Sequence, residues 1–328
     1  MAHGFEGKSH LKGDSMDLAA KLCRGAIDTH IHFLPDIIPR KMDAIELARE
    51  AKQAGMRGII LKSHYTLTAD LAFLVQKAVP GIDVWGGIAL NTPVGGINPP
   101  AVKVAIGLGA KIVWMPTISA QNHRRRLATS KAGPLLKSLG GEKLGEGIRI
   151  IDEKGNISSP LREVLQEIAR ANIILATGHL SAQEIKILVE EAIKLGVRKI
   201  LVNHPELDII NMSLDDQLGL AEKGVYFERC FFVTTSLGQR MNPARIAEAI
   251  RRVGAESTIL ATDFGQADNP SPVEGLRSYV RSMLKEGITE KEINLMVRVN
   301  PCELLKVKRR RPEVFLAKTT KKEERNEK

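Results

Sequence analysis

The chain has 328 residues, of which 43% are hydrophobic and 26% are charged, and its formal net charge is +10 at pH 7. This length allows a large buried core, whereas no apolar run approaches the roughly 18 residues that a membrane span needs. Residues 1–17 are polar and lack the apolar segment of a signal peptide. The three cysteines are widely spaced and form no CxxC, so we expect a cytoplasmic protein without disulfides or a cysteine metal site.

Much of the positive charge lies at the carboxyl end of the chain. Residues 306–328 hold ten Lys/Arg and four Glu, and therefore about six of the ten excess charges. We expect 308–328 to be a solvated tail. A tail that binds nucleic acid is the alternative, and it is less favoured because the tail has one aromatic residue, Phe315, whereas single-strand binders stack bases on several.

Apolar strands alternate with amphipathic helices along most of the sequence. Short apolar runs predict strands at 25–32, 57–64, 82–91, 111–117, 173–180, 199–205, 225–232 and 258–265. One-sided apolar patterns predict helices at 42–56, 67–79, 100–110, 161–171, 181–195, 213–223, 243–253, 271–286 and 290–306. Eight strands, each followed by a helix, predict a closed (β/α)8 TIM barrel over 25–307, after a polar segment at 1–24. An open doubly wound sheet is the alternative, but no glycine-rich phosphate loop follows the first strand.

The alternation is interrupted once, after the fourth predicted strand. Residues 118–158 form a long insertion that contains three consecutive arginines at 124–126. Within it, 148–157 is predicted to form a hairpin around the Lys-Gly-Asn sequence at 154–156. A loop of this length inside a compact domain is more often a lid or a binding loop than a simple connection.

Histidines gather at the carboxyl ends of the predicted strands. Of eight histidines, five lie there: His30 and His32 on the first strand, His64 on the second, His179 on the fifth and His204 on the sixth, while Asp263 ends the eighth. In a barrel these ends meet at one mouth, and neutral imidazole is the commonest protein ligand of zinc-like metals. We therefore predict a metal site at this mouth. The other three histidines, His3, His10 and His123, scatter over helices and loops and are not expected in the site.

With these residues the chain resembles the amidohydrolase superfamily of metal-dependent hydrolases. The matching motifs are His-x-His at 30–32, Ala-Thr-Gly-His at 176–179, Asn-His-Pro at 203–205, Ala-Thr-Asp at 261–263 and Asn-Pro-x-x-Leu-Leu at 300–305. The resemblance covers 26–307 and is closest to a little-characterised branch of unknown substrate whose second strand ends in Lys-x-His. Superfamily members include amidases, lactonases, phosphotriesterases, deaminases and decarboxylases, so the resemblance does not define the substrate.

The resemblance implies a divalent metal ion, with zinc the favoured ion. The implied ligands are His30, His32, His179 and Asp263, with His204 either as a further ligand or as a hydrogen-bond partner of water or substrate. Two-metal members usually carry a carboxylated lysine or a glutamate at the end of strand four. Because this chain has Trp-Met-Pro-Thr at 114–117, one ion is favoured and two ions are the alternative.

The resemblance also implies roles for residues around the metal. Asp263 is the implied general base, and His204, His64 or Lys62 would polarise the carbonyl of the substrate. Lys62 could instead bridge two ions as a carbamate, and Glu228 is another potential donor. We favour Lys62 paired with Asp28 or Glu228, and His64 as a substrate-binding residue. Arg229, together with the arginines at 124–126 and 240, indicates an anionic substrate. The alternative is that these arginines face solvent.

The sequence therefore predicts a metal-dependent hydrolase in which metal-activated water attacks an amide, lactone or ester bond of a small, anionic substrate. A metal-dependent decarboxylase or deaminase on the same barrel is the alternative among enzymes. Nucleic-acid binding by a non-catalytic barrel, through the basic tail, is the alternative of another class. No membrane partner is expected, and a homo-oligomer is left open.

Overall fold

The computed structural model describes residues 18–127 and 146–307, so the predicted tail at 308–328 and the middle of the insertion lie outside the described residues. The strands are β1 (Ile27–Ile31), β2 (Gly58–Leu61), β3 (Asp83–Trp85), β4 (Gly87–Ala89), β5 (Ile112–Trp114), β6 (Ile174–Ala176), β7 (Ile200–Asn203), β8 (Tyr226–Cys230) and β9 (Thr258–Ala261). The α-helices are α2 (Ala44–Gln53), α3 (Ala69–Ala78), α4 (Pro99–Gly107), α5 (Gln121–Leu127), α7 (Ser159–Ala171), α8 (Ala182–Lys194), α9 (Leu214–Ala221), α10 (Pro243–Val253), α11 (Pro272–Lys285), α12 (Glu290–Asn294) and α13 (Asn300–Leu305). Single helical turns lie at Thr92–Val94, Phe231–Thr234, Ala255–Ser257 and Leu295–Val299. None of the described helices is long and apolar enough to cross a membrane.

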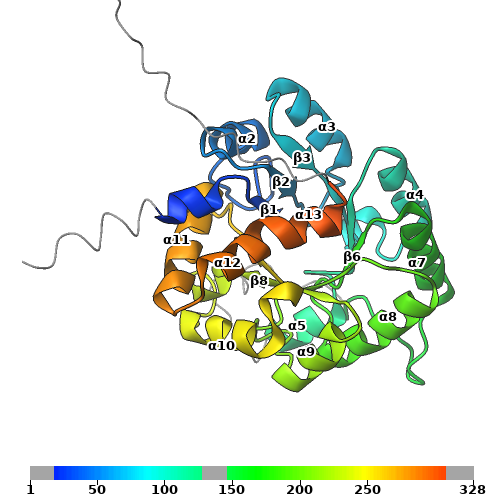
Figure 1. Ribbon diagram of the computed structural model, residues 1–328. Helices are drawn as coiled ribbons and strands as arrows, with labels where there is room; N and C mark the ends of the chain where they lie inside the picture. The colour runs from blue at the N-terminus through cyan, green and yellow to red at the C-terminus, as the bar shows by residue number, and fades with distance from the viewer. Residues whose placement is uncertain (1–17, 128–145, 308–328) are drawn as a thin grey trace, which may run out of the picture.

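All strand pairs are parallel, and they form two sheets whose strands follow chain order, β1-β2-β3 and β4-β5-β6-β7-β8-β9. One residue, Gly86, separates β3 from β4, so the sheets meet there. At the opposite edges, a parallel bridge joins Ile31 to Phe264, and the backbone N–H of Asp263 donates to the carbonyl of His30 at 2.9 Å. This arrangement confirms the predicted parallel α/β fold, and the helices surround the strands as a ring (Figure 1).

The predicted strand at 82–91 is interrupted at Gly86. A Cβ built on this glycine would lie 2.1 Å from the carbonyl oxygen of Thr68. The Thr68 hydroxyl accepts a hydrogen bond from the N–H of Gly87 at 2.9 Å and donates one to the carbonyl of Leu61 at 2.8 Å. Because the start of α3 closes directly onto the strand here, no side chain fits and the regular pairing stops.

The strands are buried on both faces, as their continuous apolar sequences predict. Their inward side chains, Ile27, Ile60, Ile112, Trp114, Ile174, Leu201 and Ile259 among them, form a core together with Cys302, Leu304 and Leu305 of α13. Helix α13 therefore covers the amino-terminal ends of the strands, and it crosses the centre of the ring in Figure 1. The predicted helix at 290–306 is divided by a π-helical turn at Leu295–Val299 into α12 and α13.

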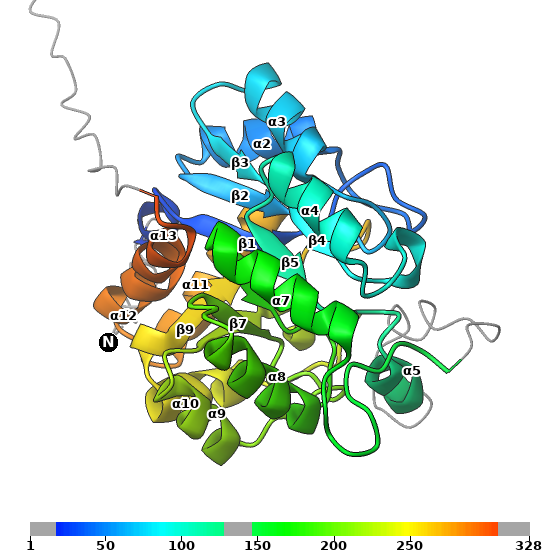
Figure 2. The ribbon, with the colours of Figure 1, turned by 90° about the vertical axis from the view of Figure 1, so that its right-hand side faces the viewer.

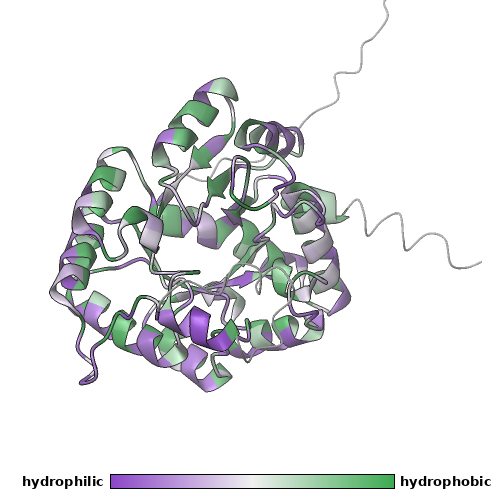
Figure 3. Cartoon of the chain, turned by 180° about the vertical axis from the view of Figure 1, so that it is seen from behind, coloured by the Kyte–Doolittle hydropathy of each residue, from purple (hydrophilic) through white to green (hydrophobic). Residues whose placement is uncertain are grey.

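The outer helices pack their apolar faces on the strands. Figure 2 shows α4, α7 and α8 as neighbouring helices of this outer layer, and Figure 3 shows hydrophilic residues on the outward surfaces of the helices. Capping boxes fix where several helices begin: Asp43 with Glu46 at α2 and Ser181 with Glu184 at α8. Each N-cap of this kind contributes about 1 kcal/mol and fixes the loop that enters the helix.

The described part of the insertion is held against the barrel. A parallel bridge joins Ala120 to Ile148, and an antiparallel bridge joins Ile151 to Ile157 at the place of the predicted hairpin. Helix α5, which the sequence did not predict, follows the first of these bridges. The side-chain amide of Asn122 donates to the carbonyls of His179 and Ile209, at 3.1 and 2.9 Å, and so fixes α5 to the loops after β6 and β7.

Candidate metal centre

The polar residues predicted for the mouth lie at the carboxyl ends of the strands. His30 lies in β1, and His32 follows it; Lys62 follows β2, His179 follows β6, His204 follows β7 and Asp263 follows β9. All these side chains except that of Asp263, which is 14% exposed, are buried. His204 and Asp263 have positive φ angles of 50° and 55°, a strained backbone for residues with side chains that is concentrated at functional sites.

Two histidines and one aspartate form the centre of the site. One Asp263 oxygen, Oδ1, lies 3.2 Å from Nε2 of His30 and 3.2 Å from Nε2 of His32. One donor atom from each of these three residues lies within 4.8 Å of the other two, which is close enough for one ion to contact all three. We call this group the His30–His32–Asp263 cluster.

A buried network fixes the orientation of His30. Its Nδ1 lies 2.8 Å from Oε2 of Glu228, which also accepts from the side-chain amide of Asn203 at 2.7 Å, while Thr29 donates to Oε1 at 2.5 Å. Because a carboxylate accepts, Nδ1 carries the proton and Nε2 keeps its lone pair toward the cluster. Glu228 therefore supports His30 from behind, and it is not among the residues that line the cavity.

Lys62 is the other partner of His30. Its Nζ lies 3.0 Å from Nε2 of His30 and 5.5 Å from the centroid of the Trp114 ring. The predicted pairing with Asp28 or Glu228 is wrong: the Asp28 carboxylate accepts instead from the hydroxyl and the N–H of Thr262, at 2.6 and 3.1 Å. Burial lowers the pKa of Lys62, which favours its neutral amine more than in an exposed lysine.

The remaining histidines form a second row beside the cluster. The His204 ring lies 4.9 Å from that of His30, and the His64 ring 4.7 Å from that of His32. His64 is oriented by Thr117, whose hydroxyl lies 2.9 Å from Nδ1. His179 belongs to none of the groups of metal donors found among the described residues, so its predicted ligand role stays a prediction.

His123 joins the site, although the sequence placed it among the scattered histidines. It lies in α5, is fully buried and stacks on His179 with ring centroids 4.8 Å apart. The two Nδ1 atoms are 2.7 Å apart, so one ring donates to the other. No motif marked this residue, because its position depends on how the insertion folds.

The imidazoles at the mouth are neutral near pH 7. Burial lowers the pKa of five of them well below the usual value, namely His30, His32, His64, His179 and His204, and lowers the pKa of His123 to about 3. Neutral imidazole is the form that binds metals. Burial raises the pKa of Asp263 to about 7, against the opposing charge of Lys62.

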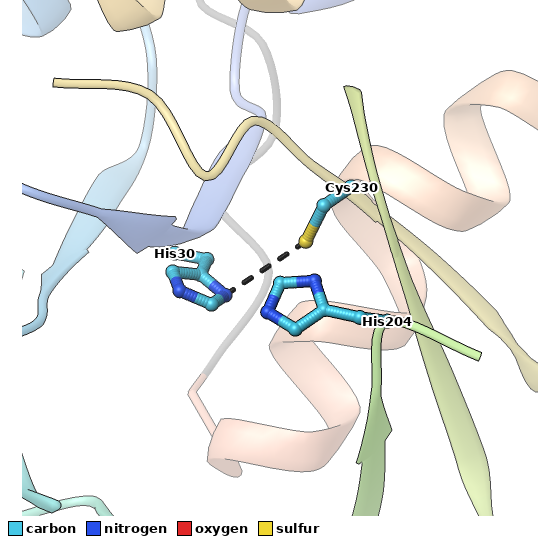
Figure 4. Close-up of side chains that lie close together, drawn as sticks. All are labelled: His30, His204 and Cys230. Carbon is cyan, nitrogen blue, oxygen red and sulfur yellow. Dashed lines mark hydrogen bonds between the residues drawn. The ribbon is translucent and has the colours of Figure 1, made fainter. Parts of the chain in front are cut away.

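Cys230 gives an alternative donor group with His30 and His204 (Figure 4). Its Sγ lies 3.8 Å from Nδ1 of His30. That nitrogen is engaged by Glu228, and burial raises the pKa of the thiol well above its usual value. The thiolate that a metal would need is therefore disfavoured, and the His30–His32–Asp263 cluster is the better candidate.

A cavity opens from the cluster. It is lined by His32, Arg40, Lys62, His64, His179, His204, Leu207, Phe232, Asp263 and Gln266. Arg229 is not among these residues, which corrects its prediction as a substrate-binding residue. It lies on the opposite face of β8 from Glu228, where its guanidinium contacts Glu206 and donates to Gln217 at 2.9 Å. Arg40, which the sequence analysis did not single out, is the arginine of the cavity.

Several solved structures have a fold similar to that of this chain. An amidohydrolase from Pseudomonas aeruginosa has a TM-score of 0.59 and 13% identity, over 89% of this chain and 98% of that one. A probable dipeptidase from the same species has a TM-score of 0.61 and 10% identity, over 89% and 98%. A 2-pyrone-4,6-dicarboxylic acid hydrolase assigned in Pseudomonas putida has a TM-score of 0.54 and 14% identity, over 86% and 97%. The chain thus has the fold of the amidohydrolase superfamily.

The sequence identifies the family more narrowly. The chain belongs to a family described as a family of unknown function, DUF6282, whose model matches residues 25–228. No curated protein matches the chain. The predicted resemblance to a branch of the amidohydrolase superfamily without a known substrate is confirmed at the level of fold and family.

Proposed function

We propose that this protein is a metal-dependent hydrolase that acts on a small, anionic substrate at the mouth of a closed (β/α)8 barrel. The His30–His32–Asp263 cluster carries the proposal, because its two imidazoles and one carboxylate bring donor atoms within 4.8 Å of one another. Donors of these types, on two segments that are distant along the chain and at one mouth, are typical of a catalytic metal site that leaves a position open for water or substrate.

The cluster fits a zinc-like ion chemically. The network behind His30 leaves Nε2 unprotonated toward the cluster, and the lowered pKa values keep His30 and His32 neutral. Nε2 of His30 has one lone pair, so such an ion would replace its contact with Nζ of Lys62, and the neutral amine that the lowered pKa of Lys62 favours would not repel a cation. The next imidazole is that of His204, with Nε2 4.0 Å from Oδ2 of Asp263.

Asp263 is the residue best placed to take a proton from water. When bound, a divalent ion would lower the pKa of water and polarise the bond to be cleaved. The carboxyl of Asp263 lines the cavity, where its oxygens can accept a proton from water and return it to the leaving group. His64, His204 and Lys62 line the same cavity, where their N–H groups can donate to an oxygen that gains negative charge.

A cationic side chain supports an anionic substrate. Among the residues that line the cavity, Arg40 carries a permanent positive charge and Asp263 is the one acidic residue. The imidazoles there add no charge near pH 7, because burial lowers their pKa values. A dicarboxylic acid also appears in the name of one structural neighbour. These observations favour a substrate that carries a carboxylate beside an amide, lactone or ester bond.

Elemental analysis tests the metal site. Protein purified without chelators should hold about one zinc-like ion per chain, and His32→Ala and Asp263→Ala should lose it while circular dichroism stays unchanged. Asp215→Ala is the matched control, because Asp215 lies on α9 with its side chain 92% exposed. If His32→Ala retains the metal content of the wild type, the cluster is not the metal site.

Hydrolysis is tested with lactones, esters and amides that carry a carboxylate, using a pH indicator to follow acid release. Turnover should disappear with a chelator and return with added zinc. Turnover that persists in protein free of metal contradicts the proposal. Release of carbon dioxide or ammonia instead of hydrolysis would assign the decarboxylase or deaminase alternative.

A further inference from the structure

Arg40 is a buried cation with free hydrogen-bond donors. Its side chain is 2% exposed, and it lines the cavity on the segment between β1 and α2. Its Nε donates to Oδ2 of Asp36 at 2.7 Å, and within residues 18–127 and 146–307 neither Nη atom has a hydrogen-bond partner. A guanidinium has five N–H donors, so the four on the Nη atoms of Arg40 remain available to a ligand in the cavity.

The segment around Arg40 is fixed to the mouth by backbone contacts. Arg40 forms an antiparallel bridge with Gln266, and the N–H of Lys41 donates to the carbonyl of Gly265 at 2.9 Å. A Cβ on Gly265 would lie 2.0 Å from the carbonyl oxygen of His32, so only glycine allows this close approach. The guanidinium is thus positioned before any ligand arrives, which lowers the cost of ordering it on binding.

A buried cation is costly unless something compensates for its charge. Asp36 compensates for part of the charge of Arg40 through its contact with Nε. The edge of the guanidinium that carries the two Nη atoms is not contacted by Asp36. Two parallel N–H groups on such a planar edge match the two oxygens of a carboxylate, and these charge-assisted bonds are roughly twice as strong as neutral ones. A neutral amide in the same place would supply one acceptor and would leave the charge uncompensated.

We infer that Arg40 forms an anion subsite that binds a carboxylate group of the substrate. The inference deepens the proposed function, on which it rests for the statement that this ligand is the substrate. Arg40 lines the same cavity as His32 and Asp263 of the His30–His32–Asp263 cluster. The substrate class is therefore a small carboxylic acid in which the hydrolysed bond lies within a few atoms of the carboxylate.

Binding of simple acids and their amides tests the subsite without any turnover. The full-length protein as purified is titrated calorimetrically with propionate, glutarate, propionamide and inorganic phosphate at constant ionic strength. We expect the two carboxylates to bind, the amide not to bind, and phosphate to bind more weakly because its tetrahedral oxygens fit the planar fork less well. Arg40→Met should weaken carboxylate binding by about tenfold or more.

Three further variants make the test specific. Arg40→Lys keeps the charge without the fork and should lose less affinity than Arg40→Met. Asp36→Asn keeps an acceptor for Nε but removes the negative charge beside the guanidinium, so it should bind carboxylates more tightly than the wild type. Arg245→Met removes one exposed charge from α10 and should bind as the wild type does. Metal content and the thermal midpoint are measured for each variant, so that loss of fold is recognised.

The outcomes separate this inference from the proposed function. Equal carboxylate binding by the wild type and a folded Arg40→Met or Arg40→Lys variant, or equal binding of propionate and propionamide by the wild type, overturns the anion subsite. Binding that depends on Arg40 in a protein that holds no metal and hydrolyses nothing upholds the subsite and rejects the hydrolase.

Discussion

The carboxylate behind His30 allows a sharp test of how the cluster is built. In Glu228→Gln the shape of the side chain is kept, but one of its two acceptor oxygens becomes an NH2 donor. The wild-type carboxylate accepts from three donors, those of His30, Asn203 and Thr29, at 2.8, 2.7 and 2.5 Å. A glutamine cannot accept from all of them, so one buried donor loses its partner or the His30 ring changes tautomer.

The tautomer change is the consequence that matters for the metal. If the new NH2 donates to Nδ1 of His30, the ring proton moves to Nε2, the atom that faces the cluster. An Nε2–H cannot bind a metal, and loss of such supporting partners typically costs 10–100-fold in metal affinity. We therefore expect a fall of this size, equivalent to about 1.4–2.8 kcal/mol of binding free energy.

Competition with a fluorescent zinc chelator measures this fall directly. Glu222→Gln is the matched control, because Glu222 is exposed at the end of α9, and its affinity should equal that of the wild type. Circular dichroism and thermal unfolding show whether the variant keeps its fold. A folded Glu228→Gln with the zinc affinity of the wild type would refute the view that Glu228 sets the tautomer of His30.

Three other predictions follow from the same geometry. His123→Phe keeps a stacked ring on His179 but removes the bond between the two Nδ1 atoms, so zinc affinity or kcat should fall while the thermal midpoint changes little, as chelator competition and kinetics would show. Gly265→Ala should unfold at much lower denaturant than Gly155→Ala, because both glycines have positive φ angles, of 135° and 82°, but a Cβ contacts other residues only at Gly265. The metal-free protein should lose stability as the pH falls below about 6.5. The six imidazoles with lowered pKa values cause this loss, because they bind protons in the unfolded chain at a higher pH than in the folded protein. The free energy of unfolding should fall by roughly 1 kcal/mol per pH unit for each proton that the unfolded chain binds in excess of the folded one. The raised pKa values of Asp28, Glu228 and Asp263 oppose this loss of stability without cancelling it. Chemical denaturation at several pH values measures the change, and stability that rises on acidification would contradict the prediction.

The order of strands and helices could be predicted from the sequence, because buried parallel strands and one-sided helices leave clear apolar patterns. The positions of the histidines and of Asp263 at the ends of these strands could be predicted for the same reason. The break at Gly86 could not, since it arises from the close approach of Thr68 from another element. The division of the last helix by a π-helical turn likewise had no signal in the apolar pattern.

Within the site, the alternation of side chains along a strand explains why Lys62 and His64 were predicted correctly and why Arg229 was not. Lys62 and His64, two residues apart, were expected on one face and both line the cavity. Glu228 and Arg229 are neighbours in β8, so they cannot both point into the barrel, and alternation alone would have excluded one of them. His123 and Arg40 lie outside the strands, in α5 and in the loop after β1, where no periodic rule places a side chain.

The position of α13 separates the two ends of the molecule. This helix covers the amino-terminal ends of the strands, and Val307, which follows it, packs on the same inner core as Tyr226, the first residue of β8. The last described residue therefore lies on the side away from the histidines. A reporter or surface anchor attached directly to Val307, in place of residues 308–328, would leave the entrance to the cavity unobstructed, so small molecules would still reach Asp263 in the immobilised protein.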